Sequence, residues 1–276
     1  MISVRRLHLF EFEDQPWLPH RWRDLLTELL AFQITRCAIY EPAVAPLQKA
    51  LEASGCRRII DLGSGAGGTA LQMQKRLRQA GCPVSLTLTD KFPNRRILAR
   101  IQGLGTPHIT YRGDPVDAAQ VPADLTGFRT LFTCFHHFDP DAARRVLAKA
   151  VEDRAPIGVF ELTERTLANL LGMLPAPLAV LFQTPKVAPR SLERLVWTYL
   201  LPVIPFLYWW DGTVSHWRTY SVRELRGLAA GLGGDSYSWE AGRIGGHRAA
   251  VTYLIGLPQR RLPSGHGTSG SCTKSP

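Results

Sequence analysis

The sequence has no paired cysteines. Its five cysteines form no CxxC pair, and they stand at Cys37, Cys56, Cys82, Cys134 and Cys272. An odd number without metal-ligand spacing argues against a disulfide framework and against a zinc site. This pattern predicts a protein of a reducing compartment such as the cytoplasm. No other group of His, Cys and carboxylate residues has ligand spacing along the chain, so we expect no metal.

Long hydrophobic runs and dense basic runs are also missing. The first residues, MISVRRLHLFEFEDQPW, lack the apolar centre of a signal peptide and soon turn acidic. The two most apolar segments, TLANLLGMLPAPLAVLF and RLVWTYLLPVIPFLYWW, are broken by proline and fall short of the ~20 apolar residues of a membrane span. The net charge of +10 is scattered, so we expect no nucleic-acid partner. A peripheral contact with a membrane surface stays an alternative.

What the sequence does contain is an alternation of short apolar runs and helical patterns. The runs RRIIDL, VSLTLTD, HITYRGD, FRTLFTCFHHF and APIGVFELT are typical of strands, and helical spacing separates them. After the fourth run, Asp139 is a capping acid and Pro140 takes the first helical position. The alternation predicts an α/β fold with a parallel sheet covered on both faces.

The organisation predicted along the chain has five parts. Residues 1–40 form an N-terminal arm and helix, and residues 41–165 form the core with its strands. The proline-punctuated residues 166–218 interrupt the alternation as an apolar helical cap, inserted after the fifth strand. Residues 219–258 close the core with a helix and a strand. Residues 259–276 are rich in Ser, Gly and Pro and are predicted to be disordered.

The stretch IIDLGSGAGG ends the first strand with a glycine-rich turn. Gly63, Gly65 and Gly67 let the backbone turn sharply and approach a ligand, and the following helix offers free N–H groups. A P-loop would need a Lys that is missing here, whereas the spacing of a dinucleotide fingerprint is present. The third candidate ligand is S-adenosylmethionine. Asp61 before the turn would repel a pyrophosphate but suits an ammonium group.

Two further acids follow the next two strands. Asp90 lies 29 residues beyond Asp61, at the end of the second strand, and can accept hydrogen bonds from ribose hydroxyls. Asp117, in VDAAQVP, can accept from an adenine amino group. The alternative is structural, because glycines are common in turns and an acid can simply cap a helix.

Taken together, IIDLGSGAG, LTLTD, VDAAQVP and TLFTCFHHF resemble the successive motifs of class I S-adenosylmethionine-dependent methyltransferases, over residues 40–165. FEFEDQPWLP and WDGTVSHWRTYS resemble a bacterial branch with no settled substrate. The resemblance implies a Rossmann-like, doubly wound sheet and S-adenosylmethionine as cofactor. By the same resemblance, Asp61, the glycine turn and Ser64 hold the amino acid end of the cofactor, and Asp90 holds its ribose. Asp117 contacts the edge of the adenine, and Phe135 packs on the adenine face.

The residues for catalysis are expected at the ends of the fourth and fifth strands. The run CFHHFDPD resembles the segment of small-molecule O-methyltransferases whose first His is the base, which makes His136 the candidate. His137 stands where those enzymes carry Asp, and a structural role for the His pair is the alternative. Glu161 could face the acceptor, orient a His or pair with Arg165, and the pair is favoured because such pairs are common.

These features predict methyl transfer to the oxygen or nitrogen of a small, apolar or amphipathic acceptor. The cap would be the lid of the acceptor site, since apolar walls with a few polar groups suit a small-molecule pocket. Asp211, His216 and Arg218 would supply the polar groups. The alternatives are a cofactor-binding protein without methyl transfer and a module that binds a membrane surface or a partner.

Overall fold

The computed structural model describes residues 5–246 and 249–259, and its centre is a seven-stranded sheet. The strands are β1 (Arg58–Leu62), β2 (Ser85–Thr89), β3 (Ile109–Tyr111), β4 (Phe128–Phe132), β5 (Ile157–Glu161), β6 (Tyr237–Gly246) and β7 (Ala249–Pro258). They lie in the order β3-β2-β1-β4-β5-β7-β6, and the first five are parallel. The predicted α/β Rossmann-like sheet is confirmed.

The far edge of the sheet differs from the prediction. β7 runs antiparallel to β5 and to β6, so the sheet is mixed rather than wholly parallel. β6 was not predicted, because its sequence YSWEAGRIGG has several glycines and little alternation. Its ten-residue pairing with β7 forms it nonetheless, which is a tertiary contact overriding local propensity. The predicted disordered tail lies outside the described residues, apart from residue 259.

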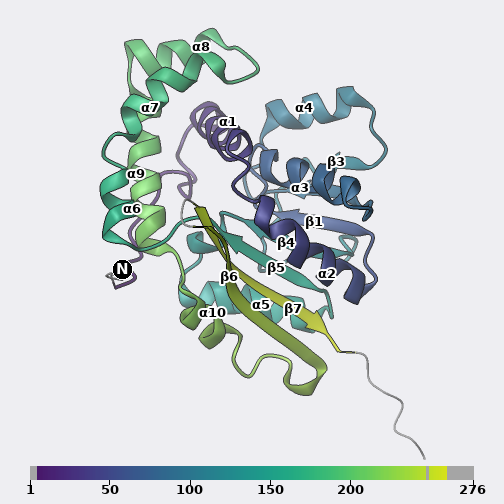
Figure 1. Ribbon diagram of the computed structural model, residues 1–276. Coiled ribbons are helices and arrows are strands. Elements are labelled where there is room, and N and C mark those ends of the chain that lie inside the picture. Colours follow the sequence, from purple (N-terminus) through teal and green to yellow (C-terminus); the bar gives the residue numbers. More distant parts are fainter. Residues whose placement is uncertain (1–4, 247–248, 260–276) are drawn as a thin grey trace, which may run out of the picture.

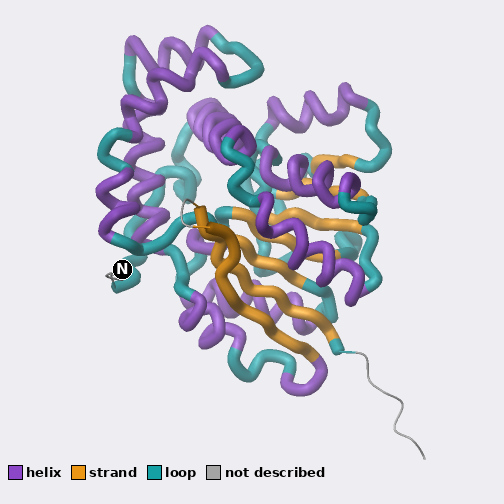
Figure 2. Tube along the Cα trace, in the orientation of Figure 1, coloured by secondary structure: helices purple, strands orange, loops and turns teal. Residues whose placement is uncertain are grey.

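Helices cover both faces of the sheet (Figures 1 and 2). One buried cluster joins the strands to α2 (Val44–Ser54), α3 (Gly68–Gln79) and α4 (Arg95–Leu104). The cluster on the other face joins them to α5 (Pro140–Glu152) and α10 (Val222–Ala229). The predicted cap of α5 is present, because the Asp139 side chain accepts a hydrogen bond from the Ala142 N–H.

The segment after β5 forms four helices that stand beside the sheet. They are α6 (Leu167–Gly172), α7 (Ala176–Gln183), α8 (Leu192–Leu195) and α9 (Val203–Arg218), and α7 and α8 project past the sheet layers (Figure 1). Their inner side packs on α1 (His20–Arg36), where Val180 and Ile204 meet Leu25 and Leu29. Among the described helices, none has the length and apolar character needed to cross a bilayer.

The N-terminal arm, residues 5–19, lies outside helices and strands and is fastened to α9. The two carboxylate oxygens of Asp211 accept the backbone N–H groups of Phe12 and Glu13, at 2.8 and 3.0 Å. The indole of Trp210 donates to the Phe10 carbonyl at 3.1 Å. These bonds hold the arm across the carboxyl ends of the parallel strands.

Candidate functional site

A cavity of about 1320 Å³ lies at the carboxyl ends of the parallel strands. Its wall is built from the glycine turn, the ends of β2, β4 and β5, helix α1, the arm and helices α6 and α9. In open α/β sheets this is where ligands bind. Small-molecule pockets usually measure roughly 300–1,000 Å³, so this cavity has room for two small ligands side by side.

Asp61 is buried in the cavity wall between two hydroxyl donors. Its two carboxylate oxygens accept hydrogen bonds from Thr130 Oγ1 at 2.6 Å and from Ser64 Oγ at 2.7 Å. Burial raises the pKa of Asp61 to about 7, and the two hydroxyl bonds oppose that rise. Ser64 therefore orients the acid. The carboxylate is costly to ionise without a ligand, and a cation in the cavity would stabilise it.

The glycine turn brings bare backbone to the cavity. Gly63 and Gly65 have φ angles of 73° and 51°, which favour glycine. A Cβ on Gly63 would lie 2.9 Å from Cys134 Sγ, and one on Gly65 would lie 3.3 Å from Thr27. Gly67 is not part of the wall; it precedes the first residue of α3. Neighbouring side chains thus leave little room for a Cβ at either position, and the backbone of the turn stays bare at the cavity wall.

Asp90 both faces the cavity and braces the turn. Its carboxylate accepts the backbone N–H of Gly65 at 2.7 Å and that of Phe92 at 2.8 Å. Burial raises its pKa, and these backbone donors act against it. Asp117 also lines the cavity, where one carboxylate oxygen accepts the Ala119 N–H and the other lies 3.6 Å from Lys91 Nζ.

Phe135 lies elsewhere. Its fully buried ring packs against Phe138 and Tyr220 in the cluster under α5 and α10, and it does not line the cavity. The cause is local: Thr133 takes a φ of 52° and residues 135–137 form a short 3₁₀ turn, which breaks the alternation of the strand. The aromatic side chains in the wall are instead those of Phe10, Phe92, Phe132, Phe138 and Tyr208.

Glu161 holds the end of β4 in place. It is fully buried; one oxygen accepts the backbone N–H groups of Phe135 and His136, and the other lies 2.7 Å from His136 Nδ1. Of the three roles considered, the structure shows the second, orienting a His. The favoured pair with Arg165 is wrong, because Arg165 binds Glu224 instead. Because a carboxylate only accepts hydrogen bonds, the Nδ1–H of His136 donates to Glu161, and in the neutral ring Nε2 is then the acceptor nitrogen, 3.9 Å from Glu11 Oε1.

His137 is an imidazolium at neutral pH. Its Nδ1 lies 2.8 Å from Asp14 and 3.1 Å from Glu11. Burial disfavours the charged ring, but the two carboxylates outweigh it and raise the pKa of His137 to about 10. Arg218 Nη1 adds a second cation, 2.6 Å from Asp14. His137 therefore holds the arm by an ion pair and does not accept a proton near pH 7.

The acids of the arm had no role in the sequence prediction. Ligand atoms of Glu11, His136 and His137 lie within 4.8 Å of one another, close enough to hold a metal ion, although nothing in their spacing along the chain indicates it. Arg218 Nη1 lies 3.4 Å from Glu11, so protein cations already neutralise this group. We therefore interpret it as an ion-pair network that links the arm to the core.

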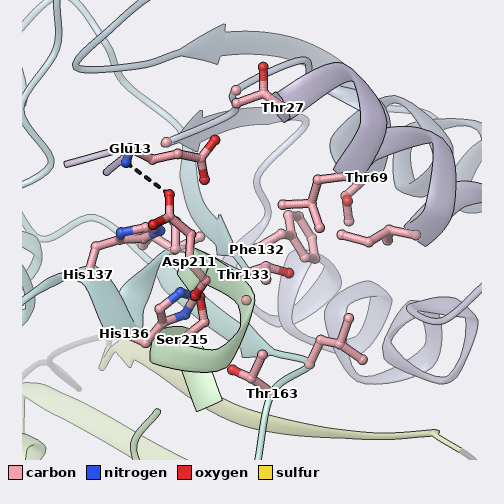
Figure 3. A pocket seen from close by; sticks show the side chains of 18 of the residues that line it. Glu13, Thr27, Thr69, Phe132, Thr133, His136, His137, Thr163, Asp211 and Ser215 are labelled. Carbon is pink, nitrogen blue, oxygen red and sulfur yellow. Dashed lines mark hydrogen bonds between the residues drawn. The ribbon is translucent and has the colours of Figure 1, made fainter. Parts of the chain in front are cut away.

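Glu13 is the acid of the arm that stays without a partner. Its side chain points into the cavity (Figure 3), and its Oε1 has no hydrogen-bond partner among the described residues. Burial, followed by repulsion from Asp211, raises the pKa of Glu13 to about 8. Burial likewise raises the pKa of Asp211 to about 7. The only sequence signal for Glu13 was the segment FEFED, in which Phe and Glu alternate without indicating a ligand site.

The comparisons with known proteins found structures but no sequence relative. No family model matches the chain, and neither does any curated protein. Magnesium protoporphyrin IX methyltransferase from Synechocystis PCC 6803, solved with bound SAH, is 12% identical over 80% of this chain and 84% of its own, with a TM-score of 0.44. Human N-acetylserotonin methyltransferase, solved with SAM, is 12% identical over 84% and 57%, with a TM-score of 0.47. A putative Zn-dependent alcohol dehydrogenase from Rhodobacter sphaeroides is 14% identical over 87% and 98%, with a TM-score of 0.50.

The strand order, the glycine turn after β1 and the acids Asp61 in β1 and Asp90 after β2 are the features that identify the fold. The fold is that of the class I methyltransferases. In this class I methyltransferase fold, the arm and α9 also line the cavity, where Glu13 and Asp211 lie next to each other (Figure 3). The wall of the cavity thus combines the glycine turn and its acids with the arm and α9.

Proposed function

We propose that this protein transfers a methyl group from S-adenosylmethionine to a small amphipathic acceptor. The observation that carries the proposal is a pair of carboxylates, the buried Asp61 and the half-buried Asp90, beside a bare glycine turn at one end of a large cavity. A ligand with an ammonium group and ribose hydroxyls satisfies these acids, whereas a pyrophosphate beside Asp61 would be repelled.

The residues present fit this cofactor. Asp61 and the backbone of Gly63 and Gly65 would hold its amino acid part, Asp90 its ribose and Asp117 its adenine amino group. The positive φ angles of Gly63 and Gly65 and their place in the cavity wall support the fit, because both residues present bare backbone to the cavity. When bound, S-adenosylmethionine supplies a methyl group on a positively charged sulfur, which is already a good leaving group.

The chain's own residues then have three tasks: to position the acceptor, to exclude water and to take up one proton. The acceptor gains the methyl group and loses a proton, while the electron pair of the broken C–S bond stays on sulfur. Glu13 suits the last task in its ionised form, which burial confines to pH values near and above its pKa of about 8; it lines the cavity, and its Oε1 has no hydrogen-bond partner among the described residues. His136 Nε2 is the second candidate, with Glu161 holding the ring.

The acceptor would lie between the arm and α9, where apolar and polar groups alternate. Leu9, Phe10 and Met173 supply apolar surface, and Asn169 and His216 supply hydrogen-bonding groups. Burial lowers the pKa of His216, so its ring is neutral near pH 7. A mixed wall of this kind fits an amphipathic molecule better than a fully apolar or a highly charged one.

Calorimetry tests the proposal against the dinucleotide alternative. We expect S-adenosylhomocysteine to bind with a Kd in the micromolar range, about −8 kcal/mol, and NADH not to bind. Asp61→Asn should weaken that binding, whereas Asp235→Asn, an exposed acid far from the cavity, should not. Tight NADH binding without S-adenosylhomocysteine binding would overturn the proposal. Binding without transfer of labelled methyl to any compound in a lipid and metabolite extract would favour a cofactor-binding protein.

A further inference from the structure

The outer side of the cap is unusually apolar. Most of the large hydrophobic side chains exposed in the described part of the chain lie between residues 167 and 206. Phe182, Leu192 and Leu200 are 75%, 77% and 75% exposed, and Leu174 and Leu178 are 64% and 59% exposed. We call the exposed side chains of residues 167–206 the outer cap face. Single exposed leucines are ordinary, but eleven large apolar side chains exposed within one segment of forty residues indicate a surface that binds something apolar.

Neither the core nor the cavity accounts for these side chains. The inner side of the cap is already buried, where Val180, Val187 and Ile204 pack against Leu25 and Leu29 of α1. The part of the cap that lines the cavity is a different set, which includes Asn169 and Met173. The prediction that the apolar cap covers the acceptor therefore explains the apolar residues on the inner side of the cap, and it does not explain the outer cap face.

The charges on this segment indicate what the face binds. Glu193 is the single acid between residues 167 and 206, and it pairs with Arg21 at 3.7 Å. Lys186 and Arg190 are exposed in the turn between α7 and α8, which projects past the sheet (Figure 1). The whole chain carries a net charge of +10. Apolar side chains flanked by basic ones are the composition of helices that lie in the interface of an anionic bilayer.

We propose that the outer cap face binds the surface of an anionic lipid bilayer. The apolar side chains enter the boundary between headgroups and acyl chains, and Lys186 and Arg190 meet the lipid phosphates. No described helix needs to cross the bilayer for this. The inference does not depend on methyl transfer. If the proposed function also holds, an amphipathic acceptor could pass from the bilayer to the cavity along α6, which contributes to both surfaces.

Co-sedimentation with vesicles tests the proposal directly. We expect the full chain to bind phosphatidylcholine vesicles that contain phosphatidylglycerol, and to bind pure phosphatidylcholine far less. The triple variant Phe182→Ser, Leu192→Ser, Leu200→Ser should lower the partition coefficient by about tenfold or more, because its lost side chains are the ones that enter the bilayer. Circular dichroism and a thermal melt should match the wild type, since all three side chains are exposed.

A second pair of variants separates local charge from net charge. Lys186→Ser with Arg190→Ser should reduce binding to the anionic vesicles, most clearly at low salt. Arg78→Ser with Arg145→Ser removes the same charge from exposed positions on α3 and α5, away from the cap, and should bind nearly as the wild type does. Equal binding by the triple variant and the wild type would overturn the proposal. So would a lipid-free dimer, seen by analytical ultracentrifugation, that the triple variant abolishes, because a second copy would then cover the face.

Discussion

Replacing Glu13 by Gln should make the protein without ligands more stable at alkaline pH and less active. The substitution keeps the shape of the side chain and removes its charge. Burial is the main cause of the raised pKa of Glu13; Asp211, Glu11 and Asp14 add to it, and His137 opposes it. The ionised carboxylate therefore destabilises the folded protein, and the neutral Gln side chain removes this cost.

The magnitude follows from linkage. An unfolded Glu releases its proton near its ordinary pKa of 4.5, whereas Glu13 in the folded protein keeps it up to about 8. Between these values the folded state binds more protons, so stability falls as pH rises, by about 1.4 kcal/mol per pH unit for one proton. Over the whole interval this gives an upper limit of about 5 kcal/mol, and relaxation around Asp211 makes about 1–3 kcal/mol the realistic range.

Urea unfolding of both proteins from pH 5 to pH 9 measures this difference. Asp61, Asp211 and Asp24 also have raised pKa values and titrate in the same range, so only the difference between the two curves reports on Glu13. We expect the curves to separate with rising pH and to become parallel above about 8. Curves parallel throughout would refute a raised pKa at Glu13. If Glu13 takes up the acceptor's proton, turnover should fall by about 10²–10⁴-fold as well.

Three further changes test the rest of the site. Asp90→Ala should weaken binding of S-adenosylhomocysteine by about tenfold or more in calorimetry, and affinity equal to that of an Asp235→Ala control would contradict the ribose assignment. Gly63→Ala should lower the free energy of unfolding by about 1–3 kcal/mol in urea, because φ is 73° and the new Cβ would lie 2.9 Å from Cys134 Sγ. An additional Cys134→Ala should recover part of this cost. Full stability of the single variant would contradict the contact. Arg218→Met should cost about 3–5 kcal/mol, because it removes one of the two cations that neutralise Glu11 and Asp14, the other being His137. It should also speed proteolysis within residues 5–19, and unchanged cleavage there would show that this ion pair does not hold the arm.

The parts of the fold that the sequence predicted are those encoded locally. Asp61, Gly63 and Gly65 form a contiguous turn whose chemistry can be read without knowing any distant contact. Asp90 follows the next strand at the same edge, so parallel pairing alone brings it to the turn, where it accepts the Gly65 N–H. The cap of α5 is local as well.

The acceptor side could not be predicted because it forms between distant segments. The bonds from Phe12 and Glu13 to Asp211 join residues about two hundred positions apart. The turn at Thr133, with its positive φ, moves Phe135 to the far face of the sheet, and no periodicity in FRTLFTCFHHF indicates it. For the same reason the ion pairs of His137 were unforeseeable, since their acids belong to a segment without regular structure.

The two hydrogen bonds from the arm to Asp211 affect which substitutions the protein can accept during evolution. Asp211 binds main-chain N–H groups, which every residue except proline offers. The side chains at positions 12 and 13 can therefore be substituted while the backbone of the arm stays in the same place at the cavity. A new residue at position 13 would meet the acceptor in the same place with different chemistry. The arm is thus a natural position for substrate preference to diverge, and for a laboratory library to begin.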